Sequence, residues 1–191
     1  MAEYSERFDE ALAFTRETHR GQLRKGSDVP YVGHLLGVAS IVIDAGGSED
    51  EAIAALLHDA AEDQGGDELL DEIERRFGRH VRDVVNELSD TLEEPKPEWR
   101  KRKENYLAHL RSASPEAKRV SLADKLYNAR SIQRDHARVG ASVWDRFKPG
   151  RDGSLWYYGE LAKFFKAEFK DTSAEALADE LDEVVESLAT L

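Results

Sequence analysis

The sequence predicts an all-α fold, a single helical bundle of about eight to ten helices. Hydrophobic residues recur at three- and four-residue spacing along most of the chain, and no segment shows the sustained alternation of a half-buried strand. Breaks rich in Gly, Pro or Ser interrupt this pattern at intervals typical of helix length. The 191 residues are 40% hydrophobic and include three Trp, seven Phe and six Tyr. This is enough apolar surface for the core of one domain.

The predicted helices follow one another with short breaks. They span residues 4–20, 31–45, 48–65, 67–78, 79–91, 98–110, 115–134, 155–169 and 172–191. Apolar side chains at helical spacing define the first helix, and polar and turn residues over 21–30 separate it from the second. Gly46-Gly47 end the second helix. Ser48 and Glu51 then form a capping box that opens the third.

Proline and glycine set the boundaries in the second half of the chain. Gly78 separates two amphipathic helices, and the Pro-Lys-Pro run at 95–97 forces an extended break. Pro115 follows Ser114 at the first position of a helix, where its missing N–H costs nothing. Residues 140–159 mix Gly, Pro, Trp and basic side chains, so we expect a loop that covers a site.

The last helix carries a stripe of apolar residues and begins with a second predicted capping box, formed by Thr172 and Glu175. We expect residues 1–170 to form the main domain and residues 171–191 to add an amphipathic helix packed on it. The same stripe is compatible with the seam of a homodimer, and docking on the domain is the favoured reading.

Charge and composition exclude several classes of function. The 27 basic and 39 acidic residues give a net charge of −12, which opposes general binding to nucleic-acid backbones. A phosphate-bearing ligand therefore needs a local basic pocket or a metal. The chain has no Cys, so a disulfide framework, a thiolate zinc site and a Cys nucleophile are excluded. The charged N-terminus and the lack of a long apolar run predict a cytoplasmic protein without membrane association.

Four polar side chains interrupt apolar runs and need an explanation, because burying them without partners is costly. They are His34, His58, Asp59 and Asp124. Simpler interpretations exist for three of them. His34 would be an ordinary core histidine, Asp59 would cap a helix or pair with an Arg, and Asp124 would pair with Arg130. Their coincidence on three predicted helices favours a divalent metal.

Helical spacing adds two more carboxylates to this group. On a continuous helix Glu62 lies over His58, and Asp63 lies over Asp59. Three carboxylates on one mostly apolar helix repel one another unless a cation compensates them. Asn128 and Ser131 follow Asp124 at the fourth and seventh positions, so that helix also presents polar groups on one face.

Three motifs carry a resemblance to a known family. They are HRGQLRKGSDVPYVGH at 19–34, AALLHDAAED at 54–63 and SPEAKRVSLADKLYNAR at 114–130. With these motifs the chain resembles the HD-domain phosphohydrolases, and among them the hydrolase domain of RelA/SpoT-type alarmone enzymes, especially the short stand-alone form also found in animals. The resemblance covers residues 4–166 and implies an HD-domain helical bundle.

The resemblance implies roles for these residues. His34, His58, Asp59 and Asp124 are the implied metal ligands, with manganese as the usual ion and other divalent metals as alternatives. Glu62 and Asp63 match the catalytic pair that positions or deprotonates the attacking water and assists the leaving group.

The resemblance also implies substrate contacts. Arg24 and Lys25 match a pair suited to stacking on a purine and touching phosphate, with a solvated loop charge as the alternative. Asn128 matches a substrate-contacting amide, or is an ordinary buried one. Tyr157 is expected near the nucleotide or in the core, and Lys96 near the distal phosphates. Residues 100–103 are expected to form a solvated helix face. Ser121 departs from the family pattern, which commonly has Lys there.

The implied activity is hydrolysis of the 3′-pyrophosphate of (p)ppGpp to GDP or GTP and pyrophosphate. Two alternatives remain open at this point. One is HD phosphohydrolase chemistry on another nucleotide, such as a nucleoside monophosphate or the 2′-phosphate of NADPH. The other is a nucleotide-sensing or protein-binding HD module without turnover.

Overall fold

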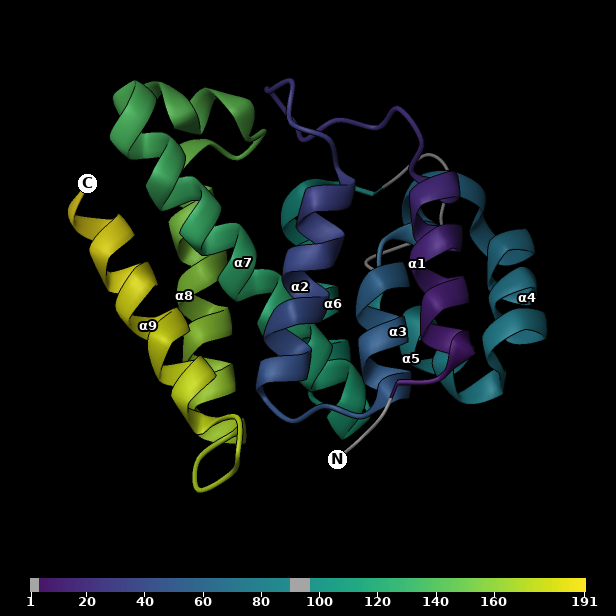
Figure 1. Cartoon of the computed structure of the whole chain (residues 1–191). Coiled ribbons are helices and arrows are strands. Elements are labelled where there is room, and N and C mark those ends of the chain that lie inside the picture. The colour runs from purple at the N-terminus through teal and green to yellow at the C-terminus, as the bar shows by residue number, and fades with distance from the viewer. Residues whose placement is uncertain (1–3, 90–96) are drawn as a thin grey trace.

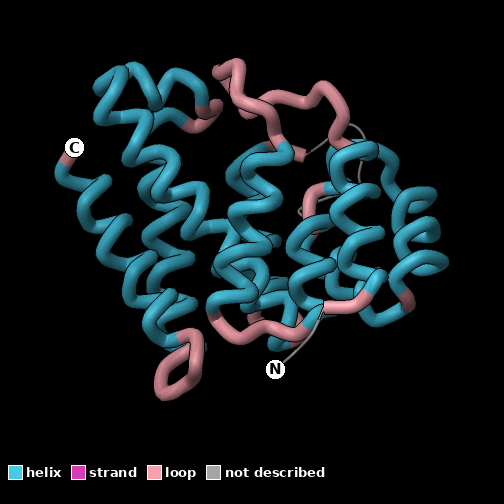
Figure 2. Tube along the Cα trace, viewed as in Figure 1, coloured by secondary structure: helices cyan, strands magenta, loops and turns pink. Residues whose placement is uncertain are grey.

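The computed structural model describes residues 4–89 and 97–191, which form nine α-helices and no β-strand (Figures 1 and 2). The prediction of an all-α fold is confirmed. The helices are α1 (Glu6–Thr18), α2 (Val32–Asp44), α3 (Glu49–Leu57), α4 (Gly66–Phe77), α5 (Arg79–Leu88), α6 (Trp99–Leu110), α7 (Pro115–Val139), α8 (Gly150–Glu168) and α9 (Glu175–Thr190). Two short elements join them: η1, a π-helical turn (Ala61–Gly65), and η2, a 3₁₀ helix (Gly140–Arg146).

Helix α7 links the two halves of the molecule (Figure 1). Its N-terminal half packs with α2, α3 and α5, and α1 and α4 cover the outer side of that group. On the other side of the molecule α8 and α9 pack against each other and against α7. A side chain on one face of α7 can therefore face α2, the end of α3 and α8 at once.

A close approach between α2 and α7 depends on one glycine. A Cβ atom added at Gly37 would lie 2.0 Å from the ring of Tyr127, so only glycine leaves room for that ring. The Tyr127 hydroxyl donates a hydrogen bond to the Gly33 carbonyl at 3.2 Å. This contact sets α2, which carries His34, against the middle of α7.

Two of the predicted helix starts are confirmed by their hydrogen bonds. Ser48 Oγ accepts from the Glu51 amide at 3.2 Å, and Glu51 Oε2 accepts from the Ser48 amide at 2.7 Å. Ser114 Oγ accepts from the Ala117 amide at 3.2 Å, and Pro115 occupies the first turn of α7. Each cap satisfies an amide that has no partner within its helix.

The loop expected over residues 140–159 is wrong for most of that segment. Helix α7 continues past residue 134 to Val139 and is capped by Gly140, whose φ of +65° suits a residue without a side chain. The 3₁₀ helix η2 follows, and α8 already begins at Gly150. Val143 and Trp144 of η2 are buried. Burial of these two side chains outweighs the loop tendency of the glycines and the proline.

The capping box predicted for the last helix is also wrong. Ala174 occupies the N-cap position, and no side chain caps α9. Thr172 lies in the turn before it, where its hydroxyl donates to the Phe169 carbonyl at 2.7 Å and accepts from the Ala174 amide at 3.2 Å.

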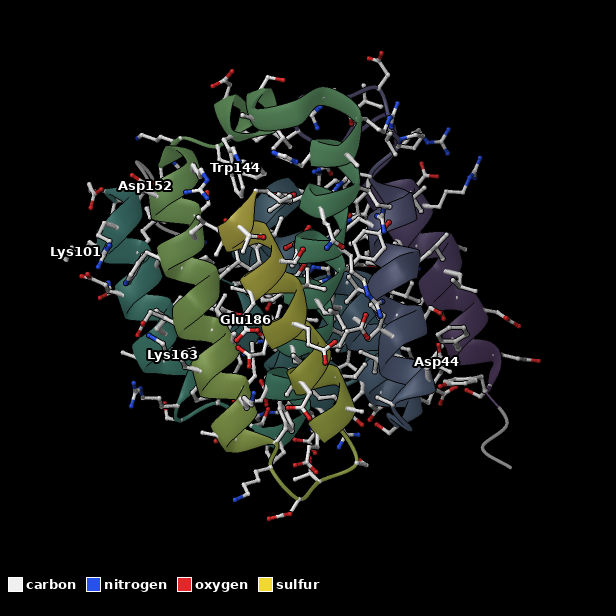
Figure 3. All side chains as sticks on the ribbon, turned by 90° about the vertical axis from the view of Figure 1, so that its left-hand side faces the viewer. Asp44, Lys101, Trp144, Asp152, Lys163 and Glu186 are labelled. Atoms are coloured by element: carbon white, nitrogen blue, oxygen red, sulfur yellow. The ribbon has the colours of Figure 1, made fainter. Side chains whose placement is uncertain are left out.

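The apolar stripe of α9 packs on α7 and α8, with Leu181 and Leu188 fully buried. Figure 3 views this side of the molecule, with Glu186 on α9 and Lys163 on α8 among the charged side chains of the surface. Among the described residues, no helix is both long and apolar enough to cross a membrane.

Candidate metal centre and the two cavities beside it

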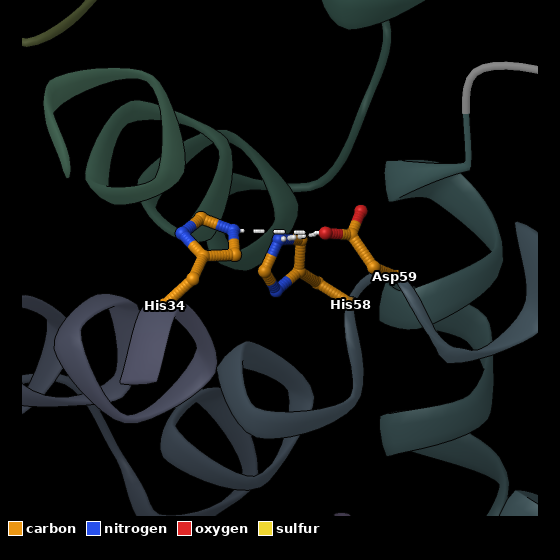
Figure 4. Close-up of side chains that lie close together, drawn as sticks. All are labelled: His34, His58 and Asp59. Carbon is orange, nitrogen blue, oxygen red and sulfur yellow. Dashed lines mark ion pairs between the residues drawn. The ribbon is translucent and has the colours of Figure 1, made fainter. Parts of the chain in front are cut away.

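Two histidines and two aspartates from three places in the fold meet at the face of α7. His34 lies in the first turn of α2, His58 and Asp59 follow the end of α3, and Asp124 lies on α7. His58 Nε2 is 3.0 Å from Asp59 Oδ2, and His34 Nε2 is 3.6 Å from the same oxygen (Figure 4). Asp124 Oδ1 lies 3.2 Å from His34 Nε2 and 3.6 Å from His58 Nε2. The structure thus brings the four predicted ligands together.

Both imidazoles aim Nε2 at the carboxylates of this centre. His58 Nδ1 donates to the Ala55 carbonyl at 2.8 Å, which fixes the tautomer and leaves Nε2 aimed at the carboxylates. Nε2 of His34 and of His58 is buried without a hydrogen-bond partner among the described residues. One ligand atom each from His34, His58 and Asp59 lies within 4.8 Å of the others. This donor set fits a divalent metal ion, which would satisfy the orphaned nitrogens.

The charges of the centre are strongly coupled. Burial alone would lower the pKa of His58, but the Asp59 and Asp124 carboxylates outweigh it and hold that pKa well above its usual value. The pKa of Asp59 lies well below its usual value despite burial, because of both histidines. The pKa of Asp124 is also well below normal despite burial, chiefly because Lys125 Nζ lies 2.5 Å from Oδ2. Both carboxylates therefore stay ionised, as metal ligands must.

The chain changes its helical geometry just after His58. The sequence predicts one helix from Ser48 to residue 65, but α3 ends at Leu57 and the π-helical turn η1 follows two residues of hydrogen-bonded turn. The Asp63 amide still bonds to the Asp59 carbonyl at 3.0 Å. Glu62 and Asp63 therefore reach the cavity of the centre from a widened turn rather than from a regular helix face.

A polar relay behind Asp63 escaped the sequence analysis. Gln22 Nε2 donates to Asp63 Oδ2 at 2.8 Å, and Gln22 Oε1 pairs with His19 Nδ1 at 2.7 Å. Burial and the charge of Asp59 raise the pKa of Asp63, whereas burial lowers the pKa of His19. His19 and Gln22 do not lie in a periodic pattern of the sequence. Their hydrogen-bonded connection to Asp63 is therefore visible only in the folded structure.

A cavity of about 240 Å³ contains the predicted catalytic and metal-binding carboxylates. It is lined by Tyr31, His58, Asp59, Glu62, Asp63, Leu88, Lys103, Tyr106, Asp124, Lys125, Asn128 and Tyr157. We call it the acidic cavity. The sequence analysis did not identify Tyr31, whose hydroxyl donates to Asp59 Oδ2, or Lys125. The π-turn places both members of the predicted pair in this cavity with the metal-type ligands.

Helix α6 contributes to the acidic cavity, contrary to the expectation of a solvated face over residues 100–103. Arg100 is exposed and pairs with Glu104, but Lys103 lines the cavity with its Nζ 5.1 Å from the Tyr157 ring. The Tyr106 hydroxyl and Ser121 Oγ are 2.7 Å apart and buried. Ser121 thus places a small hydroxyl next to Tyr106, which lines the cavity.

Residues 21–30 form a compact, hydrogen-bonded loop between α1 and α2. The Arg24 amide bonds to the Val29 carbonyl at 2.8 Å, and the Tyr31 amide bonds to the Gln22 carbonyl at 2.9 Å. The Arg24 guanidinium lies over the rings of Tyr31 and Tyr127 and donates to Asn128 Oδ1 at 2.8 Å. Arg24 and Asn128, both predicted to contact substrate, are therefore held together.

A second cavity of about 860 Å³ adjoins the acidic one, and Tyr31 and Asn128 line both. We call it the basic cavity. Arg24 and Lys25, both predicted to contact substrate, line it, and Lys25 is exposed. Tyr158, which the sequence analysis passed over, lines the basic cavity, whereas Tyr157 is buried at the acidic one. Lys96 lies outside the described residues.

The HD-domain family profile matches residues 11–155, more than half of the chain. The chain belongs to the HD-domain family. Two relatives in this family are proteins named guanosine-3′,5′-bis(diphosphate) 3′-pyrophosphohydrolase MESH1. The Xenopus tropicalis protein is 44% identical and the Homo sapiens protein 43% identical, each over 128 residues that cover 65% of this chain and 69% of the relative.

Two solved structures share the HD-domain fold of this chain. One is described as a metazoan ortholog of SpoT that hydrolyzes ppGpp and plays a role in starvation responses. It superposes with a TM-score of 0.79 at 28% identity, over 100% of both chains. The other, lmo0812 from Listeria monocytogenes EGD-e, has a TM-score of 0.72 at 30% identity and covers 83% of this chain and 99% of its own. The family confirms the expected class of hydrolase.

Proposed function

We propose that this chain is a manganese-dependent hydrolase that removes the 3′-pyrophosphate of (p)ppGpp, giving GDP or GTP and pyrophosphate. One observation carries the proposal: the cluster of His34, His58, Asp59 and Asp124 lies at an acidic cavity that adjoins a cavity of nucleotide size. The activity named for its relatives and for the metazoan structure supports the choice of substrate.

The four clustered side chains are the proposed metal ligands. Two imidazole nitrogens and carboxylate oxygens suit manganese, and other divalent ions with similar preferences are alternatives. A bound divalent ion would polarise the phosphoryl group and lower the pKa of a water molecule. Tyr31 and Lys125 hold Asp59 and Asp124 in place, because each donates a hydrogen bond to one of these carboxylates.

Glu62 and Asp63 are the proposed proton-transfer groups. Water attacks the phosphorus that is bonded to the ribose 3′-oxygen, and the bond between this phosphorus and the 3′-oxygen breaks. The 3′-oxygen needs a proton as the pyrophosphate is released. One carboxylate takes the proton from water and the other supplies a proton to the 3′-oxygen. The raised pKa of Asp63 suits it to carry a proton, and Gln22 orients its side chain.

Side chains around the two cavities provide recognition. Lys103 and Lys125 place positive charge beside the acidic cavity, where the pyrophosphate would lie. Arg24 presents a planar cation to the basic cavity, which suits stacking on a purine. Asn128 lies where the cavities meet and is the proposed contact to the nucleoside. Tyr157 supports the wall of the acidic cavity.

A substrate panel tests the proposal. Purified protein loaded with Mn²⁺ is assayed with ppGpp, pppGpp, NADPH and nucleoside monophosphates, and kcat/KM is compared. The proposal predicts the highest kcat/KM for ppGpp or pppGpp and loss of turnover after chelation. Faster turnover of NADPH or a monophosphate would reassign the substrate. Tight ppGpp binding without turnover would indicate a sensing module instead.

Three further expectations stay predictions. They are the boundary between residues 1–170 and 171–191, a homodimer seam on α9, and a cytoplasmic location. Size-exclusion chromatography with light scattering would test the dimer, because the buried stripe of α9 predicts a monomer unless another surface is used.

A further inference from the structure

The lining of the basic cavity includes arginines that neither the motifs nor the proposed chemistry uses. Arg134 and Arg138 lie on the last turns of α7, and Arg146 lies on η2. All three line the cavity, together with Arg24 and Lys25 of the loop over residues 21–30. They fall in the segment 131–146, beyond the last motif at residue 130.

The charge of this cavity opposes the charge of the chain. Its lining includes five basic side chains, Arg24, Lys25, Arg134, Arg138 and Arg146, against two acidic ones, Asp28 and Asp135. The whole chain carries −12. Such a local positive field in an anionic protein concentrates a polyanionic ligand at one place.

Arg134 and Arg138 extend a row of polar side chains on one face of α7, and this row begins at Asp124 of the candidate metal centre. Asp124, Asn128, Ser131, Arg134 and Arg138 follow one another at three- and four-residue spacing, so they lie along one face of the helix. Asp124 and Arg138 are separated by about 21 Å along the axis, at roughly 1.5 Å per residue. A ligand with its 3′ end at Asp124 would direct its other end along this row.

Local contacts hold two of these arginines in position. Arg134 donates to Ser131 Oγ at 2.9 Å and lies over the Tyr127 ring. Arg146 pairs with Asp135 at 2.5 Å, and a Cβ atom at Gly26 would touch its side chain at 2.9 Å, so the loop over 21–30 closes against it. Arg138 has no hydrogen bond or ion pair among the described residues. It is therefore available to an incoming anion.

We propose that Arg134, Arg138 and Arg146 form a subsite for the 5′-phosphates of the nucleotide. The inference rests on the proposed function, because it takes the 3′-pyrophosphate to lie at the metal-type centre. Arginine suits this role, since its guanidinium stays charged and binds phosphate oxygens with two parallel hydrogen bonds. The subsite selects nucleotides that carry phosphate at both the 3′ and the 5′ positions.

The test compares two substrates that differ only at the 5′ end: ppGpp and guanosine 3′-diphosphate with a free 5′-hydroxyl. In the double variant Arg134→Gln/Arg138→Gln, KM for ppGpp should rise about tenfold with kcat unchanged. KM for the 5′-hydroxyl nucleotide should not change. The double variant Arg134→Lys/Arg138→Lys, which keeps the charge, should recover part of the loss. An unchanged KM for ppGpp, or an equal rise for both substrates, would overturn the subsite.

Two controls separate the subsite from stability and from the proposed reaction. Arg75→Gln/Arg79→Gln removes two exposed arginines, 71% and 82% accessible, from outside the cavity and should leave both KM values unchanged. Calorimetric titration with GDP and with guanosine needs no turnover. GDP should bind wild type more tightly than guanosine, and only GDP should weaken in the Gln variant. Equal binding of the two would overturn the subsite, whereas failure to release pyrophosphate from ppGpp would overturn the proposed function alone.

Discussion

The acidic and the basic cavities lie side by side on one face of α7 but differ in size and charge. The acidic cavity, of about 240 Å³, contains four carboxylates and the imidazole of His58. The basic cavity, of about 860 Å³, contains five basic side chains. Among the described residues, Tyr31 and Asn128 line both cavities.

This difference indicates how an acidic protein accommodates a polyphosphate. Carboxylates concentrated at one end of the polar row on α7 favour a metal ion, and arginines at the other end favour phosphate. The proposed chemistry and the proposed recognition thus fall in adjacent cavities, and substitutions in the two should change different kinetic constants.

The largest effect is expected from removing a carboxylate of the metal-type centre. Asp59→Ala deletes a proposed ligand and leaves His58 without its closest carboxylate. Turnover of ppGpp should fall by roughly 10³-fold or more. Calorimetry with Mn²⁺ should show weakened metal binding, while circular dichroism should show unchanged helix content. Full activity with bound metal would remove Asp59 from the centre.

Replacement of Asp63 should separate proton transfer from metal binding within the same cavity. Asp63→Asn preserves size and hydrogen bonding to Gln22, but cannot carry a proton. We expect kcat to fall by about 10²- to 10³-fold with little change in KM or in Mn²⁺ stoichiometry. The companion variant Gln22→Ala should give a smaller fall in kcat. If Asp63→Asn lost metal instead, Asp63 would belong to the ligand set.

The close packing of α2 against α7 positions side chains of both cavities. Gly37→Ala places a methyl group against the Tyr127 ring, so the helices must separate or the ring must move. The free energy of unfolding should decrease by about 2 kcal/mol, measured by urea denaturation. Gly33→Ala on the same helix meets no atom within 4 Å and is the matched control. Equal stability of the two variants would show that the contact is dispensable.

Arg24→Ala should act on recognition and leave the chemistry intact. It removes the cation that lies over Tyr31 and Tyr127 and that donates to Asn128. KM for ppGpp should rise about tenfold with kcat nearly unchanged, as steady-state kinetics would report. A fall in kcat without a change in KM would move Arg24 from recognition to catalysis.

The sequence predicted the helical fold and singled out the histidines and carboxylates that cluster in the structure, because those signals are local or chemically conspicuous. Polar residues such as His34 and Asp124 stand out in apolar runs, and the Ser48 cap depends on residues three positions away. The prediction of a loop over residues 140–159 was wrong because the burial of Trp144 depends on tertiary packing, which glycine and proline content does not reveal.

Other features depend on distances between remote segments. The bond from Gln22 to Asp63 joins residues 41 positions apart, and the bond from Arg24 to Asn128 joins residues 104 positions apart. Neighbouring Tyr157 and Tyr158 point to different cavities, and a gapped motif cannot choose between them. Regular helical spacing likewise did not predict the π-helical turn η1, which carries Glu62 and Asp63 into the cavity that His58 also lines.

The most direct measurement is product analysis after incubation of Mn²⁺-loaded protein with ppGpp. Anion-exchange chromatography separates GDP and pyrophosphate from the products of cleavage at the 5′ end or at the terminal phosphates. The proposed division between the two cavities predicts GDP and pyrophosphate in equal amounts, with no inorganic phosphate. Cleavage at the 5′ end, release of single phosphates, or no turnover with metal bound would contradict it.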